Sequence, residues 1–377
     1  MCTRVNNAVE SSPLVKREIS GHRHSSWRST RSKVLDQGRK KIRSFEVAER
    51  ANISRSTVSR VFSGDPRISE ETRSRVMAAA TELGYRPNLI ARGLKNSRTG
   101  IVGVVVTEIG SAYHSLALQM LVEKMASARL APLVFVGKTQ QGTGNAIARL
   151  MSYQVDAVIA LAAPFADDIV EACKAGKKPL VLMNDYSGAE NVATVGTDNY
   201  LAGQMVAKHL IARGARRFAF FGGQDGTDIS NKRSRGYSDT ISEAGHSLSL
   251  WSTAHFDYVE ALAAARDLAR QALDSRVDAI FAANDTLAFA LSDVLRDIAP
   301  PGSSLPLLVG YDNSAMSNWP GYDLTSVDHN LDDMIDLSIQ TAINMADDPF
   351  APAPKRLIQP VLVARGSTSS NRLQRSL

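Results

Sequence analysis

The chain has 377 residues, of which 44% are hydrophobic and 22% charged, a balance typical of a soluble globular protein with two or three domains. No apolar run approaches the roughly 18 residues of a membrane span, and the N-terminus has no apolar core of a secretory signal. We therefore expect a cytoplasmic protein without a membrane segment. Only two cysteines are present, too few for a disulfide framework or a thiolate metal cluster, so no metal and no cofactor are predicted.

Positive charge is concentrated towards the N-terminus. Residues 1–100 contain 21 Lys and Arg against 9 Asp and Glu, a net charge of +12, whereas the remaining residues contain 23 against 29, a net charge of −6. A polyanion-binding module joined to a mildly acidic body gives this distribution, and so does a solubilising tail. Residues 1–42 show no sustained helical or strand period and are predicted to be a disordered basic extension.

Three short helices are predicted between residues 43 and 86. Each begins at a serine that is suited to capping, and these serines are Ser44, Ser54 and Ser69. Gly84 is the stop signal of the third helix. Three short helices joined by tight turns indicate a helix-turn-helix unit.

The second of these helices, RSTVSRVF, carries hydrogen-bond donors on its outer face. Val58 and Val61 are at core spacing, which leaves Arg55, Ser56 and Arg60 outside. In the DNA major groove arginine can bond guanine O6 and N7 together, and serine can bond either a base or a phosphate. This face therefore suits the recognition helix of a DNA-binding unit.

From residue 101 onward, apolar strand-like runs alternate with helical patterns. Such alternation predicts parallel sheets that are covered by helices on both faces. Roughly 270 residues of this pattern exceed one open sheet, so two α/β lobes are predicted. The strand-like runs are residues 101–106, 132–137, 156–161, 179–184, 217–223, 278–284 and 306–313, and the clearest helical patterns are residues 205–214 and 258–273.

Several motifs in this order carry a resemblance. VAERANISRSTVSRVFSG is followed by TRSRVMAAATELGYRPN, and VGTDNYLAG, RSRGY, DAIFAANDTLA, VGYDN, LTSV and VARGST come later. From about Lys41 to Thr368 the sequence resembles the LacI/GalR (lactose-repressor) family of bacterial transcription regulators. The resemblance implies a small all-α helix-turn-helix domain followed by a two-lobed α/β periplasmic-binding-protein-like domain.

The resemblance also implies roles in DNA binding. Residues 88–94, NLIARGL, are similar to the family's hinge helix, which orders on DNA and inserts a leucine into the minor groove. Leu94 holds that position, and the alternative is a linker leucine packed on its own lobe. The expected contacts are Arg55, Ser56 and Arg60 in the major groove; Ser54, Thr57 and Ser59 on the DNA backbone; and Asn88, Ala91, Leu94 and Lys95 at the hinge and minor groove.

In the α/β body the resemblance implies an effector cleft between the lobes, lined by loops at strand C-termini. Sugars offer dense hydroxyl groups, which suit Asp, Asn and Arg side chains beside an aromatic ring, whereas a buried arginine would also grip a carboxylate or phosphate. Asp198 and Asp285 are interpreted as helix caps instead. The expected effector-binding residues are Tyr113, Asn184, Arg233, Asn284, Asp312 and His329.

Two departures from the family pattern affect this cleft. The segment TEIGSAYHS lacks the usual Asn-Pro before its aromatic residues, which leaves the lining of the first lobe open. His329 stands where other members often carry Gln. It would change the effector class or make binding sensitive to pH, or it would be a solvated loop histidine.

The sequence thus predicts a ligand-responsive, sequence-specific DNA-binding transcriptional regulator, a repressor of carbohydrate-uptake or catabolic genes. We expect a homodimer that binds a pseudo-palindromic operator in double-stranded DNA and responds to a sugar or sugar derivative. The alternative is a regulator of the same fold that senses a nucleobase or another non-sugar, or has lost its effector. The expected domains are an extension (1–42), the helix-turn-helix domain (43–86), hinge and linker (87–99), the effector and dimerisation domain (100–368) and a tail (369–377).

Two other classes of protein fit the sequence less well. An enzyme is disfavoured because GTGNAI (142–147), the nearest approach to a dinucleotide-binding motif, lacks the third glycine and is interpreted as a loop. A plain solute-binding protein is disfavoured by the helix-turn-helix signature.

Overall fold

The computed structural model divides into two compact units, residues 1–88 and residues 89–377. Within the described part of the chain, no helix is both long and apolar enough to cross a membrane. The described residues are 42–86, 98–106, 109–137, 147–161, 166–184, 191–223, 228–348 and 350–369.

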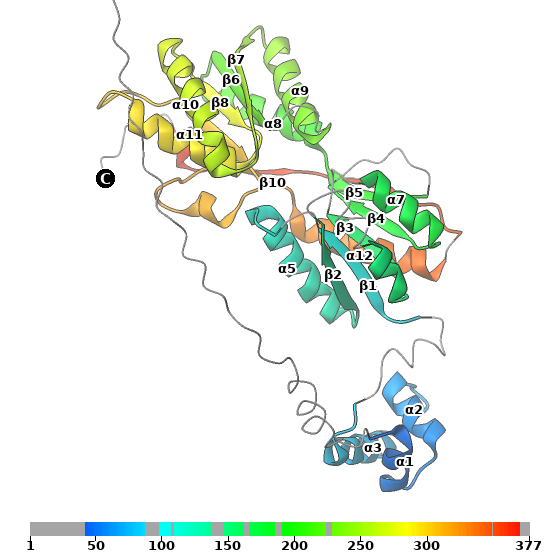
Figure 1. Cartoon of the computed structure of the whole chain (residues 1–377). Helices are drawn as coiled ribbons and strands as arrows, with labels where there is room; N and C mark the ends of the chain where they lie inside the picture. Colours follow the sequence, from blue (N-terminus) through cyan, green and yellow to red (C-terminus); the bar gives the residue numbers. More distant parts are fainter. Residues whose placement is uncertain are drawn as a thin grey trace, which may run out of the picture. The chain divides into compact units, whose positions relative to one another are not determined.

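The described part of the first unit consists of three short helices around a small apolar core (Figure 1). Val47, Val58, Val61 and Val76 contribute to this core from all three helices, and each is almost fully buried. The spacing of these residues leaves one face of the second helix in solvent. The helices are α1 (Ser44–Arg50), α2 (Arg55–Ser63) and α3 (Glu70–Leu83).

Two of the three predicted helix caps are confirmed. Ser54 Oγ accepts from the Thr57 backbone N–H, and Ser69 caps α3 in the same way. The prediction for α1 is wrong: Arg43 is its N-cap and Ser44 is its first helical residue. The Arg43 backbone N–H donates to the Glu46 carboxylate at 2.6 Å, so a side chain from inside the helix satisfies this end.

The first lobe of the second unit has a parallel six-stranded sheet in the order β11-β5-β4-β3-β1-β2. Its central strands are buried throughout, as the apolar runs predicted. The strands are β1 (Ile101–Val106), β2 (Ala131–Val136), β3 (Ala157–Leu161), β4 (Leu180–Met183), β5 (Ala193–Thr197) and β11 (Lys355–Ile358), and the helices packed on them include α5 (Ala112–Ser127), α7 (Ala166–Ala175) and α12 (Leu331–Asp347).

The second lobe repeats this plan, with strand order β12-β10-β9-β8-β6-β7 (Figure 1). Only the β10–β12 pair is antiparallel among the strand pairs described in this lobe. The strands are β6 (Arg217–Gly223), β7 (Ser247–Ala254), β8 (Ala279–Ala282), β9 (Leu307–Tyr311), β10 (Thr325–Asp328) and β12 (Val361–Val363), and the helices are α8 (Asn199–Ala212), α9 (Asp228–Glu243), α10 (Tyr258–Asp274) and α11 (Asp285–Ile298).

The chain crosses between the lobes at three places. It passes from β5 into α8, whose apolar side belongs to the second core, and returns from β10 into α12, whose apolar side belongs to the first. A third crossing joins β11 to β12. Residues at the ends of β5 and β10 therefore lie where the two lobes are connected.

The predicted two-lobed α/β architecture is confirmed, and so are all seven strand-like runs to within two residues. The strands β5, β7, β10, β11 and β12 escaped prediction. β7 is an edge strand in which exposed and partly buried residues alternate, and β11 begins with a lysine and an arginine. Apolar content alone does not identify such strands, because they need only one apolar face or none.

Candidate functional site

The N-terminus of α2 is built from hydroxyl groups. Ser54 Oγ lies 2.7 Å from Ser56 Oγ and 2.8 Å from Thr57 Oγ1, and it accepts the Thr57 backbone N–H at 3.1 Å. The chain of hydroxyls stands at the positive end of the helix dipole, where an anionic oxygen is favoured. These residues are therefore suited to a DNA phosphate.

The outer face of α2 is open to solvent. Arg55, Ser56, Ser59 and Arg60 are exposed, whereas Thr57 is half-buried beside the cap. Residues four apart share one helix face, so Arg55 and Ser59 form one row and Ser56 and Arg60 the next. The predicted hinge residues Asn88, Ala91, Leu94 and Lys95 lie outside the described residues, and so do residues 142–146 of the predicted loop. Ile147, the last residue of that loop, is helical and buried, so the loop prediction is wrong at this position.

The second site lies at the C-terminal ends of the strands of the second lobe and centres on Arg233 of α9. Its side chain is buried, and Nε donates to Asn199 Oδ1 at 2.8 Å while Nη1 donates to the Ala283 carbonyl at 2.6 Å. The guanidinium carbon lies 3.4 Å from the centroid of the Tyr311 ring. Within the described residues Nη2 makes no hydrogen bond, so one donor group of a fixed arginine is open to a ligand.

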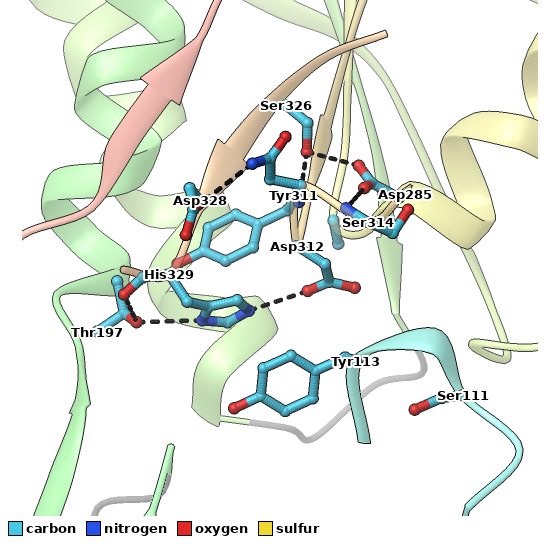
Figure 2. A network of polar contacts seen from close by, with 12 residues as sticks. Ser111, Tyr113, Thr197, Asp285, Tyr311, Asp312, Ser314, Ser326, Asp328 and His329 are labelled. Atoms are coloured by element: carbon cyan, nitrogen blue, oxygen red, sulfur yellow. Dashed lines mark hydrogen bonds and ion pairs between the residues drawn. The ribbon is translucent and has the colours of Figure 1, made fainter. Parts of the chain in front are cut away.

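His329 connects two of the three crossings between the lobes (Figure 2). Its Nε2 lies 2.9 Å from Asp312 Oδ1, and its Nδ1 lies 3.1 Å from Thr197 Oγ1 at the end of β5. The side chain is 1% exposed, which rules out a solvated loop histidine. Burial, followed by the positive charge of Arg233, lowers the pKa of His329 well below its usual value. The imidazole is therefore neutral at pH 7 and binds as a hydrogen-bonding group.

Aromatic rings enclose this histidine from both lobes. The Tyr113 ring, on α5 of the first lobe, lies 4.7 Å from the His329 ring, and the Tyr311 ring of the second lobe lies 4.8 Å from it (Figure 2). Burial raises the pKa of Tyr311 to about 12 and also raises that of Tyr113, so both hydroxyl groups remain protonated. The two lobes thus meet through flat side chains, which suits one face of a small ring-shaped ligand.

Asp312 follows β9 and has a backbone φ of 110°, a conformation that L residues rarely adopt. Its backbone N–H donates to the Val327 carbonyl at 2.9 Å, which holds the residue in place. Burial raises the pKa of its carboxyl to about 7, although the nearby positive charges of Arg233 and then His114 oppose the rise. Oδ1 faces His329, and Oδ2 has no hydrogen-bond partner among the described residues. A strained, half-buried carboxyl with one unpaired oxygen is typical of a binding site.

Asn184 and Asn284 offer amide groups at strand ends. Asn184 follows β4 with φ 55°, and its Oδ1 is buried without a partner in the described part of the chain. Burial raises the pKa of the Tyr113 hydroxyl, and a hydrogen bond with the Asn184 side chain opposes that rise. Asn284 is the N-cap of α11, where its Oδ1 accepts from Leu287. This use leaves its Nδ2 available as a donor.

The interpretation of Asp285 as the cap of α11 is wrong, because Asn284 holds that position. Asp285 is buried and accepts hydrogen bonds from the Ser314 backbone N–H at 2.7 Å and from the Ser326 hydroxyl at 2.6 Å (Figure 2). It accepts a third from the Ser317 hydroxyl, also at 2.6 Å. It ties α11 to the loop after β9 and to β10. The cap predicted at Asp198 is confirmed by its bond from the Leu201 N–H.

Three residues of this network were missed by the sequence reasoning: Thr197, Asn199 and Tyr311. Asn199 Oδ1 accepts from Arg233 and, at 3.0 Å, from the Tyr311 hydroxyl, so it links these two side chains. A signal existed, because Thr197 and Asn199 flank the capping residue in VGTDNYLAG and Tyr311 directly precedes Asp312. Among the described residues no group of three or more His, Cys, Asp and Glu side chains could hold a metal ion.

Both parts of the chain match models of known protein families. The model of "Bacterial regulatory proteins, lacI family" matches residues 45–88, and that of a periplasmic binding protein-like domain matches residues 207–368. The maltose regulon regulatory protein MalI of Escherichia coli K12 is 31% identical over 257 residues, which cover 66% of this chain and 73% of MalI.

Two solved structures have the same architecture. A complex of the transcriptional regulator CelR with cellobiose is 26% identical, with a TM-score of 0.66 and coverage of 86% of this chain and 99% of CelR. A lac repressor dimer bound to operator is 19% identical, with a TM-score of 0.74 and coverage of 87% of this chain and 99% of the repressor chain. At that identity the second likeness concerns the fold.

Proposed function

Because this chain belongs to the LacI family of bacterial regulatory proteins and is a DNA-binding transcriptional regulator, we propose that it represses carbohydrate-uptake or catabolic genes. A small carbohydrate in the cleft changes its affinity for operator DNA. The protein acts in the cytoplasm as a homodimer on a pseudo-palindromic operator. Its body binds the effector and performs no catalysis.

One observation carries the choice of a carbohydrate: the open groups of the proposed cleft include both donors and acceptors. Arg233 Nη2 and Asn284 Nδ2 are donors, whereas Asp312 Oδ2 and Asn184 Oδ1 are acceptors. A sugar hydroxyl donates one hydrogen bond and accepts others, so it satisfies both kinds of group, and a flat aromatic such as Tyr113 suits its ring. The similarity to a regulator solved in complex with cellobiose supports the same class of ligand.

The operator is read by α2 in this proposal. Arg55, Ser56 and Arg60 contact base edges in the major groove, and Ser54, Thr57 and Ser59 contact the DNA backbone. Asn88, Ala91, Leu94 and Lys95 act at the minor groove. The corresponding domains are the extension (1–42), helix-turn-helix domain (43–86), hinge and linker (87–99), effector and dimerisation domain (100–368) and tail (369–377).

The effector controls DNA affinity by favouring one arrangement of the lobes. Thr197 and His329 join two of the three crossings by hydrogen bonds, and Tyr113 contacts His329 from the other lobe. A ligand that bonds Asp312 or displaces Tyr113 therefore acts directly on the joint between the lobes. It shifts their equilibrium by the difference between its affinities for the two arrangements.

The experiment is a melting-temperature screen of the full-length protein against sugars, sugar acids, sugar phosphates and nucleobases. A ligand at 100 times its Kd adds about 2.7 kcal/mol of stability. We expect a neutral sugar to raise the melting temperature, and Asp312→Asn and Arg233→Lys to remove the rise. Arg235→Ala, on the exposed side of the same helix, is the matched control and retains it.

Each other result of the screen has a definite meaning. Binding of a sugar acid or sugar phosphate alone would show that Arg233 pairs with an anion, and binding of a nucleobase alone would overturn the carbohydrate assignment. No response to any class would remove the ligand-controlled part of the proposal and leave the DNA-binding part. A response that survives both cleft variants would place the ligand elsewhere.

A further inference from the structure

The arginines of the first unit differ in what their guanidinium groups bind. Arg50 donates through Nε and Nη2 to the Glu82 carboxylate, at 3.1 and 2.9 Å. Arg67 forms the same kind of pair with Asp65, at 2.9 and 2.7 Å. Arg73 donates to two main-chain carbonyl oxygens. These three guanidinium groups are occupied by the protein's own acceptors, and each also forms an ion pair with a carboxylate, which for Arg73 is that of Glu70, 3.5 Å from Nε.

Arg55 is held in a different way. Its Nε donates to the hydroxyl of Ser44 at 3.1 Å, and no bond from either Nη group is found within the described residues. The acceptor is neutral, so the guanidinium keeps its full charge. Nε is also the nitrogen that the common two-bond contact of arginine with guanine O6 and N7 leaves unused when both Nη groups bind. The bond therefore fixes the side chain without occupying the donors that would read a base.

Ser44 has no other evident task. It is the first helical residue of α1, but the cap of that helix is Arg43, whose N–H is satisfied by Glu46. Its side chain accepts from a residue 11 positions later, on the next helix. Serine also has a lower helix propensity than alanine, so its presence at this position does not favour α1 itself.

We propose that Ser44 is a positioning residue for operator recognition, which holds Arg55 by Nε and turns both Nη groups outward towards a base edge. An arginine that is already fixed loses less side-chain freedom on binding, which favours the one base pair whose acceptors match its direction. The proposal rests on the proposed contact of Arg55 with a base. Ser44 contributes to specificity through Arg55 and touches no base itself.

The test begins by selecting operators from a randomised duplex library with the full-length wild-type protein. Affinities for the best operator, and for every single base-pair change in it, are then measured for wild type, S44A, S44T, R55A and the S44A/R55A double variant. Melting temperatures of all five proteins check the fold. S44T is the matched control, because threonine retains the hydroxyl.

We expect S44A to weaken binding to the best operator about 2- to 12-fold, the range of one hydrogen bond of ordinary net strength. The loss is absent when Arg55 is already alanine, and S44T binds within about twofold of wild type. In the base-pair scan, S44A and R55A reduce discrimination at the same base pair. A merely structural serine would not select one base pair in this way.

Three outcomes overturn the proposal, and they are distinguishable. An equal loss from S44A in both backgrounds shows that Ser44 contacts DNA directly. An unchanged S44A, with R55A altering one base pair, leaves the contact of Arg55 with a base intact and removes Ser44 from it. An R55A protein with an unaltered base-pair scan refutes the contact of Arg55 with a base, and the role of Ser44 fails with it.

Discussion

The proposed recognition helix and the proposed effector site each contain an arginine, and the two arginines have opposite surroundings. Arg55 is exposed and has one neutral hydrogen bond, whereas Arg233 is 4% exposed, donates to Asn199 and Ala283 and covers the Tyr311 ring. The first side chain keeps both Nη groups for a ligand, and the second keeps only one. A DNA base edge approaches from solvent, so it needs an arginine whose two Nη groups are both accessible. A small ligand instead binds side chains whose positions are already fixed by the surrounding protein.

The partners of the two arginines also differ in distance along the chain. Ser44 lies 11 residues from Arg55, whereas the partners of Arg233 lie 34 and 50 residues away, on α8 and after β8. The geometry of the recognition helix is therefore a local property of three helices. That of the cleft depends on how helices and strands of the whole second lobe pack together. Substitutions that disturb this packing separate the two regions.

The largest effect on stability is expected from Gly236→Ala, where α8 and α9 pack against each other. A Cβ on Gly236 would stand 2.0 Å from the Tyr200 carbonyl oxygen, and one on Gly203 2.1 Å from the Arg233 carbonyl oxygen. Neither backbone oxygen can move alone, so the two helices must separate and carry Arg233 away from Tyr311. We expect a loss of at least about 4 kcal/mol in the free energy of unfolding.

Urea unfolding followed by the fluorescence of Trp251 and Trp319, both in the second unit, measures this loss. Gly321→Ala is the control, because nothing lies within 4 Å of its added Cβ, and its effect is expected to stay within about 0.5 kcal/mol. Hydrogen exchange of α2 should be unchanged by either substitution. A Gly236→Ala protein of wild-type stability would show that the helices can separate at no cost, and the account of the rigid cleft would fail.

A smaller effect is expected from Asp285. Asp285→Ala leaves one buried N–H and two buried hydroxyls without their acceptor, which costs about 3 kcal/mol. Asp285→Asn keeps one oxygen for Ser314 and Ser317 and offers an amide to Ser326, whose hydroxyl can accept. We expect it to cost about 1 kcal/mol. Equal losses would show that the charge, and not the hydrogen-bond geometry, matters at this position.

The dependence of stability on pH tests the same residue. Burial, with the charge of Asp312 second, raises the pKa of Asp285 to about 7 in the folded protein, against an unfolded value of about 4. The folded state therefore binds a proton that the unfolded state has released, and this stabilisation, complete below about pH 4, is lost as the pH rises through 7. Relative to Asp285→Asn, wild type should lose stability over that interval. A constant difference from pH 4 to 7 would mean that the three donors keep the carboxyl ionised throughout.

The features that could be predicted from the sequence are those determined by residues close together in the chain. The core face of α2, its cap at Ser54 and the exposure of Arg55 follow from spacing within a few residues. Strands such as β3 and β4 are buried on both faces and therefore read as continuous apolar runs. These features were predictable because neighbouring residues determine them.

The network of the cleft was not predictable in this way. The imidazole of His329 is placed by Thr197, 132 residues earlier, and its burial could not be inferred from a polar segment such as VDHN. Asp285 and Asn284 are adjacent and both suit a helix N-terminus, so composition could not decide which one caps. The choice depends on Ser314, Ser317 and Ser326, which supply donors to Asp285 only in the folded lobe.

The smallest effects, expected from two matched caps, sharpen the comparison within the recognition unit. Ser54 and Ser69 each begin a helix and each accept the backbone N–H of a threonine three residues later. Replacing either by alanine should cost about 1 kcal/mol and raise local hydrogen exchange about fivefold. Exchange measured in α2 and α3 of the full chain checks this.

Only one of the two substitutions is expected to change DNA binding beyond its effect on stability. Ser54 Oγ is joined to the hydroxyls of Ser56 and Thr57 on the exposed start of α2, whereas the cap of α3 lies outside the proposed interface. Ser54→Ala should therefore weaken binding equally for all operator sequences, as the loss of a backbone contact does, and Ser69→Ala should leave affinity within about twofold. Equal affinities of the two variants would mean that Ser54 acts as a cap and nothing more. A loss from Ser54→Ala that depends on the base sequence would instead bring the hydroxyl chain into base recognition, alongside Arg55.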